Sequence, residues 1–180
     1  VAVGQRGHIV YSDDFGLNWQ QASVPLSADL LAVYFPTSTD GWAVGHSGVV
    51  LHSSDTGATW TKQLDGRQIG RLLVDHYSKL SAEQPDNEQL QTLLSDAQRT
   101  QEEGEDSSFL DVWFENDKVG YIVGTFNLIL RTEDGGKNWT PILENTDNPR
   151  GFHLNAIGQV GDEVVVVGEQ GIVLKRDRAS

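Results

Sequence analysis

Short runs of apolar residues alternate with turn residues along most of the chain, and this pattern predicts β-strands. One stretch predicts four consecutive strands, named A to D in chain order, at 30–35, 41–45, 49–53 and 59–63. The same succession returns at 109–114, 120–124, 128–130 and 138–140, and in part at 154–157, 164–167 and 172–174. Four short antiparallel strands in about 40 residues are the size of one β-propeller blade. We therefore predict an all-β fold, in which residues 1–180 form one β-propeller domain or a fragment with roughly three to four blades.

Residues 66–106 interrupt this pattern between the second and third repeats, because their apolar positions recur at helical spacing. One stripe contains Ile69, Leu72, Leu73, His76, Tyr77 and Leu80, and a second contains Leu90, Leu93, Leu94 and Ala97. We expect an inserted αα-hairpin with helices at about 67–82 and 87–103. Asp86 and Gln89 are expected to cap the second helix and Gly104 to end it. The stripes either pack against each other and the blade, or form a docking arm for a partner protein.

A turn motif, [Ser/Thr]-x-Asp-x-Gly-x-x-Trp, follows strand C in three repeats. Its Asp can accept backbone N–H bonds from its own turn, its Gly permits positive φ, and its Trp can pack between neighbouring sheets. We assign these residues a structural role, the alternative being a cation or sugar site on the carboxylates. The motif residues are Ser12, Asp14, Gly16 and Trp19; Ser53, Asp55, Gly57 and Trp60; and Thr132, Asp134, Gly136 and Trp139.

These motifs, together with Gly-Trp-Ala-Val-Gly at 41–45, resemble the Asp-box or bacterial neuraminidase repeat. The fuller pattern resembles the photosystem II stability/assembly factor-like β-propellers, within a sialidase-like superfamily. The resemblance covers nearly the whole chain apart from 66–106. It implies a seven-bladed, extracytoplasmic (periplasmic or secreted), non-enzymatic scaffold that helps assemble membrane or envelope complexes. Three to four blades fall short of seven, so we expect either a fragment or a ring completed by self-association with a second chain.

Composition narrows the range of partners. The net charge of −13 argues against binding nucleic acid and favours neutral or basic partners. The chain has no Cys, which excludes disulfides, thiolate metal sites and Cys nucleophiles. No apolar run is long enough to span a bilayer, and an export signal would lie upstream of residue 1. No cofactor is expected, and no metal site either, because the histidines lack local metal-ligand spacing.

Sialidases and some endoglucanases also carry Asp boxes, so glycoside hydrolysis is the alternative function. Sialidase chemistry needs an arginine cluster and a Tyr nucleophile, whereas Tyr11 and Tyr121 occupy repeated strand positions. Endoglucanase chemistry needs two facing carboxylates, for which Asp29 and Asp111 are the candidates at a central channel. Such a site would have to be completed by missing blades.

Alternating strand directions place the B–C turns and the D–A connections on one face, opposite the Asp boxes. The hairpin is a D–A connection, so it should lie beside the B–C turns. The side chains of these turns vary between repeats on a constant glycine frame, which is typical of recognition loops, although unconstrained surface turns would look the same. We predict a non-catalytic scaffold that binds a protein partner here. The candidate binding residues are Arg6, His46, Phe126 and Glu169 from the turns, with Arg71 and Tyr77 from the hairpin.

Overall fold

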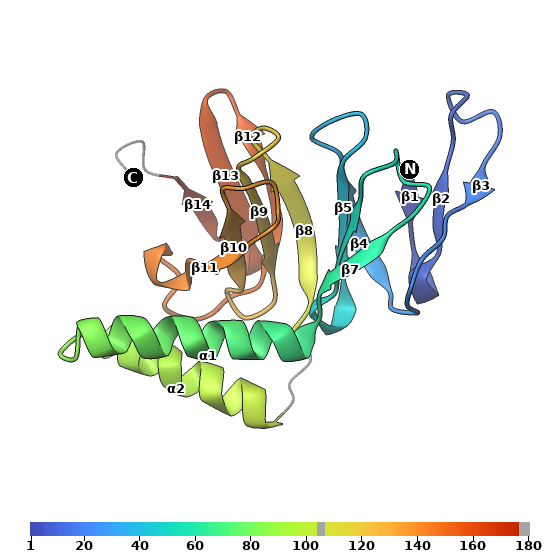
Figure 1. Ribbon diagram of the computed structural model, residues 1–180. Coiled ribbons are helices and arrows are strands. Elements are labelled where there is room, and N and C mark those ends of the chain that lie inside the picture. The colour runs from blue at the N-terminus through green and yellow to red at the C-terminus, as the bar shows by residue number, and fades with distance from the viewer. Residues whose placement is uncertain (104–106, 177–180) are drawn as a thin grey trace.

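Four antiparallel sheets lie side by side in the computed structural model, which describes residues 1–103 and 107–176 (Figure 1). Blade 1 contains β1 (Ala2–Val3), β2 (Ile9–Tyr11) and β3 (Gln20–Gln21). Blade 2 contains β4 (Leu30–Tyr34), β5 (Gly41–Gly45), β6 (Val50–Ser53) and β7 (Thr61–Leu64). Blade 3 contains β8 (Phe109–Phe114), β9 (Gly120–Gly124), β10 (Ile129–Thr132) and β11 (Thr140–Pro141). Blade 4 contains β12 (Leu154–Val160), β13 (Glu163–Gly168) and β14 (Val173–Lys175).

The strand order within each sheet follows the chain, as in a propeller blade. The partial propeller with an inserted helical hairpin is therefore confirmed. Among the described residues, blade 1 has no strand A and blade 4 has no strand D.

The hairpin consists of α1 (Gly66–Glu83) and α2 (Glu88–Glu103). Asp65 caps α1 by accepting a hydrogen bond from the Gln68 amide. The predicted cap of the second helix is wrong by one residue: Asn87, not Asp86, precedes α2, and its Oδ1 accepts from the Leu90 amide at 3.3 Å. Both residue types cap helices well, so composition alone does not separate them. Gly104, the expected end of the helix, lies outside the described residues.

Each pair of neighbouring sheets encloses an apolar core. Trp60 packs between blades 1 and 2 and is 3% exposed, and Trp139 packs between blades 2 and 3 and is 6% exposed. Each of these indoles meets the edge of a phenylalanine at the end of strand A in its own blade, Phe35 or Phe114. Trp19 is 51% exposed, contrary to the expectation, because blade 1 has neither a strand A nor a preceding sheet in the described residues.

The three Asp-box turns share the hydrogen bonds of the Asp carboxylate and of the Ser or Thr hydroxyl. An indole bond is made in addition by Trp19 and Trp60, whereas Nε1 of Trp139 is buried without a partner in the described residues. In the second turn, the Asp55 carboxylate accepts from the Thr59 amide at 2.8 Å, and the Ser53 hydroxyl accepts from the Gly57 amide at 3.0 Å. Gly57 has φ of +92°, a conformation that suits glycine. The Trp60 indole N–H donates to the Gly57 carbonyl at 2.9 Å. These local bonds make the motif a self-contained turn.

The hairpin packs into the core between blades 2 and 3. Ile69, Leu73, Tyr77, Leu90 and Ala97 are buried there beside residues of β8 and β10. Figure 1 shows the hairpin at the end of the blades opposite the Asp-box turn between β2 and β3, as strand alternation predicts. The apolar stripes therefore anchor the hairpin on the propeller, which favours the packing interpretation over a free arm.

Glycines at the ends of the B strands allow a close approach of strand A. A Cβ added to Gly124 would lie 2.0 Å from the Ser108 carbonyl oxygen, and Gly45 and Gly168 show the same crowding. Gly4 is the corresponding residue of blade 1, and a Cβ there would meet nothing within 4 Å. A side chain at the end of strand B is thus excluded only in the blades that have a strand A.

We expect Gly124→Ala to lower the free energy of unfolding by about 1–3 kcal/mol, because its methyl group forces strand A away from strand B. The matched control, Gly4→Ala, should change it by less than about 0.5 kcal/mol. Urea denaturation followed by tryptophan fluorescence measures both. Equal losses in the two variants would contradict this explanation of the glycine.

A second prediction concerns the stability of the fold at low pH. Hydrogen bonds from the Thr59 hydroxyl and amide lower the pKa of Asp55, and bonds from the Asn138 side chain and amide lower the pKa of Asp134. A carboxyl whose folded pKa lies below its unfolded pKa stabilises the fold above the unfolded value, and this contribution disappears as the pH falls through the folded value.

Stability should therefore decrease below about pH 4. The double variant Asp55→Asn, Asp134→Asn should show a shallower decrease, measured as the melting temperature against pH. Parallel curves for the two proteins would refute the assignment.

Candidate functional site

Four short turns between strands B and C share one backbone conformation on the hairpin side of the molecule. Three of them are the 3-10 turns η1 (Gln5–Gly7), η2 (His46–Gly48) and η4 (Glu169–Gly171), and blade 3 has the turn 125–127. The middle residue of each turn is left-handed, with φ between 54° and 58°. These middle residues are Arg6, Ser47, Phe126 and Gln170. The scaffold therefore presents four different side chains in one orientation.

Phe126 is the exceptional member of this set. A bulky residue is rarely left-handed, and this one is 61% exposed. Its amide donates to Nδ1 of His153 at 2.9 Å, and the two rings meet edge to face at 4.8 Å. The His153 amide in turn donates to the Glu169 carboxylate at 3.0 Å. Contacts with blade 4 thus hold the Phe126 backbone in a disfavoured conformation and its apolar ring in solvent.

Similar contacts tie the other turns to the following blade. The Arg6 amide donates to Oδ1 of Asp29 at 2.8 Å, and Nδ1 of His46 lies 2.9 Å from the Ser108 hydroxyl. The residues before each strand A, namely Asp29, Ser108 and His153, therefore hold the turn of the preceding blade. Arg6, His46, Phe126 and Glu169 all lie on this face, and Glu169 belongs to the contacts that support Phe126.

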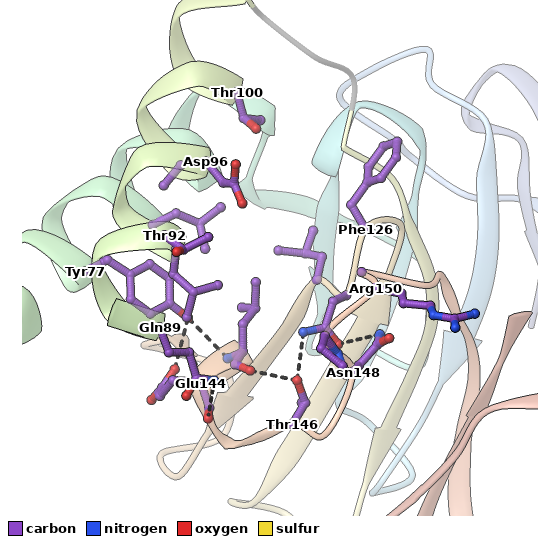
Figure 2. A pocket seen from close by; sticks show the side chains of 18 of the residues that line it. Tyr77, Gln89, Thr92, Asp96, Thr100, Phe126, Glu144, Thr146, Asn148 and Arg150 are labelled. Carbon is purple, nitrogen blue, oxygen red and sulfur yellow. Dashed lines mark hydrogen bonds between the residues drawn. The ribbon is translucent and has the colours of Figure 1, made fainter. Parts of the chain in front are cut away.

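A cleft of about 960 Å³ separates the hairpin from the turns of blade 3, and Phe126 stands at its edge (Figure 2). Leu73, Leu93 and Ala97 line the hairpin side. Leu128 and the connection 143–151 line the opposite side. The volume lies in the range of binding pockets in proteins.

Tyr77 holds one end of this cleft together. Its hydroxyl donates to Oε2 of Glu144 at 3.0 Å and accepts from the Leu143 amide at 3.2 Å. Burial and the Glu144 charge raise the pKa of Tyr77, so the hydroxyl stays protonated. Gln89 of α2 donates to the Glu144 carbonyl at 3.1 Å, which ties the second helix to the same residue. Tyr77 is 1% exposed, and these hydrogen bonds give it a role in positioning the hairpin, while its contact with a partner stays a prediction.

Asn127, Thr146 and Asn148 line the propeller side of the cleft. Figure 2 shows Thr146 and Asn148 near Glu144. Asn127 donates to the Thr146 hydroxyl at 2.7 Å and accepts from Asn148 at 2.9 Å. Asn127 is left-handed where the other three turns have glycine, and this substitution is the one sequence signal for the group.

Arg71 lies apart from this cleft, exposed on α1 beside a second hollow of about 720 Å³. That hollow also contains Arg67 and Ser47 of the η2 turn.

The two carboxylates considered for glycoside hydrolysis occupy structural positions. Asp111 is partly buried, and its oxygens accept from the Val112 and Ile157 amides, each at 2.9 Å, which links β8 to β12. Burial raises the pKa of Asp111, and these two amides oppose the shift. Asp29 binds the Arg6 amide. These contacts account for both residues without catalysis.

The described residues contain no group of three or more His, Cys, Asp or Glu arranged to hold a metal ion. Neither described helix is long and apolar enough to cross a bilayer.

Comparison with known proteins identifies the relatives of this chain. A curated relative from Synechococcus sp. (strain CC9902), the photosystem II assembly lipoprotein Ycf48, is 33% identical over 87 residues. That match spans 45% of this chain and 26% of the relative. This chain therefore spans only part of its relatives.

Two solved structures share the fold. A structure of YCF48 bound to D1 peptide superposes with a TM-score of 0.60 at 20% identity, covering 97% of this chain and 44% of that one. YCF48 from Cyanidioschyzon merolae gives 0.51 at 21% identity, covering 81% and 36%. The family model described as photosynthesis system II assembly factor YCF48 matches residues 1–83 and 90–179. This chain belongs to that family of Asp-box β-propellers.

Proposed function

We propose that this chain is part of a non-catalytic propeller scaffold that binds a protein partner. The binding surface consists of the turns between strands B and C and the cleft between the hairpin and blade 3. The single observation that carries this proposal is Phe126. An exposed phenylalanine with left-handed φ is unfavourable for solvation and for backbone geometry. Phe15 shares both properties, but Phe126 also lines the cleft beside the hairpin, which Phe15 does not. The fold needs only a left-handed residue at position 126, as Arg6, Ser47 and Gln170 show.

The relatives support the kind of partner. The curated relative is a lipoprotein of photosystem II assembly, and one solved relative is bound to D1 peptide. By analogy, this chain acts outside the cytoplasm and binds a segment of a membrane-complex subunit. No arrangement at Asp29 or Asp111 favours glycoside hydrolysis over this function.

The outer sheets point to a larger assembly. On blade 1, Trp19 and Leu17 are exposed, and on blade 4, Val160, Val167 and Val173 are exposed. The equivalent faces of inner blades are covered by a neighbouring sheet. We infer that further blades, or a second copy of the chain, cover these faces and that residues 1–180 are one arc of a ring.

Two exposed phenylalanines provide a matched test. Phe126→Ser should weaken partner binding at least about tenfold, because it removes the apolar anchor at the cleft. Phe15→Ser is the control, since Phe15 is also left-handed and exposed but lies in the Asp-box turn of blade 1 on the opposite face. The immobilised protein and both variants are incubated with detergent-solubilised membranes of the source organism, and bound proteins are quantified by mass spectrometry.

The proposal requires a set of membrane proteins that wild type and Phe15→Ser retain and Phe126→Ser loses. Equal capture by all three would refute it, as would a loss confined to Phe15→Ser. Circular dichroism checks that both variants keep their strand content.

A further inference from the structure

The cleft beside Phe126 continues into a second hollow. This hollow of about 720 Å³ lies between α1 and the η2 turn of blade 2. Leu73, Thr100 and Ser107 line both spaces, so the two hollows adjoin under the hairpin, and we refer to them together as the groove. One wall is the hairpin, and the other consists of turns from blades 2 and 3.

Two arginines line the far end of this groove. Arg67 and Arg71 are one turn apart on α1, and the Arg71 Nε–H donates to the Arg67 carbonyl at 3.4 Å. Within the described part of the chain, neither guanidinium forms an ion pair with a carboxylate. Arg6 and Arg150 also have no ion pair there, whereas Arg99, Arg131 and Arg176 each have an acidic partner.

This pair is notable in a chain with 26 acidic and 13 basic residues. Acidic side chains are abundant, yet two neighbouring guanidinium groups at a concave surface lack a carboxylate among the described residues. Asp65, which also lines this hollow, is engaged by Lys62 Nζ at 2.6 Å and by the Gln68 amide at 3.1 Å. The hollow therefore presents guanidinium donors suited to a carboxylate from another molecule.

The two ends of the groove differ in chemistry. The Phe126 end combines an exposed aromatic ring and Leu93, Ala97 and Leu128 with side chains of both charges. The other end offers Arg67 and Arg71, with Asp65 already engaged by Lys62. An extended peptide covers about 3.3 Å per residue, so a short segment can reach both environments. Apolar anchors supply affinity and charge-assisted hydrogen bonds fix register.

Resting on the proposed function, we propose that this groove binds an extended acidic segment of the partner protein. A side-chain carboxylate of that segment is held by Arg67 and Arg71, and an apolar side chain packs beside Phe126. The arginine pair thus selects acidic segments against the general negative charge of the protein.

The test uses fluorescein-labelled peptides of about 12 residues with blocked ends, long enough to span the groove at about 3.3 Å per residue. Each has a Leu-Phe pair and, several residues away, a Glu-Glu, Gln-Gln or Lys-Lys pair. Fluorescence anisotropy measures binding to the whole chain at low and physiological salt. The Glu peptide should bind about 10- to 100-fold more tightly than the Gln peptide, with a preference that shrinks as salt increases.

The double variant Arg67→Gln, Arg71→Gln should lose this preference while binding the Gln peptide as wild type does. Lys79→Gln is the matched control, because it removes one positive charge from α1 outside both hollows and should keep the preference. Unchanged thermal melting of each variant checks that it is folded. A further variant neutralises the acidic sequence at 102–106, and it should bind the Glu peptide at least as tightly as wild type.

Several results would overturn the proposal. These are no saturable binding, equal binding of the Glu and Gln peptides, stronger binding of the Lys peptide, or a preference that survives the arginine substitutions. Loss of Glu-peptide binding in the variant neutralised at 102–106 would overturn it too. The proposed function is judged separately, because capture of membrane proteins that depends on Phe126 can persist when acidic selectivity fails.

Discussion

The structure depends on the face-to-face stacking of neighbouring sheets, which covers blades 2 and 3 on both faces. All five residues of β5 and of β9 are buried. In β5, Trp42 and Val44 face blade 3 while Ala43 faces blade 1, so successive side chains enter different cores. Such a strand cannot lie at a surface, and a single blade would expose the apolar residues of both its faces. Stability is therefore a property of neighbouring blades, as in other repeat architectures.

Because stacking fixes the backbone, the turns between strands B and C are held in one conformation while their side chains vary. The middle residues have nearly the same left-handed φ despite being Arg, Ser, Phe and Gln. The residue before the next strand A ties each turn to the following blade, as Asp29 does for Arg6 and His153 for Phe126. A rigid frame with variable side chains suits recognition, since little order has to be gained on binding.

Local periodicity predicted the strands, the hairpin and the face on which the hairpin lies. It did so because these features depend on residues close in sequence and on strand alternation. It missed the contacts of Tyr77 with Glu144 and the Asn127–Asn148 bond, which join residues distant in sequence. A tyrosine in an apolar stripe of a helix gives the same sequence pattern whether it packs against a partner or against its own chain. The exposure of Trp19 was missed for the same reason, because the motif does not reveal whether a neighbouring sheet covers it.

The hairpin can be anchored on the propeller and still line the proposed binding cleft. Its stripes fill the core between blades 2 and 3, and Tyr77 and Gln89 fix both helices to Glu144. A loosely tethered hairpin would have to be ordered when a partner binds, which reduces affinity. This one is already packed, so its outer edge forms a fixed wall opposite Phe126 (Figure 2). The buried hydrogen bonds of Tyr77 thus help to preform the cleft.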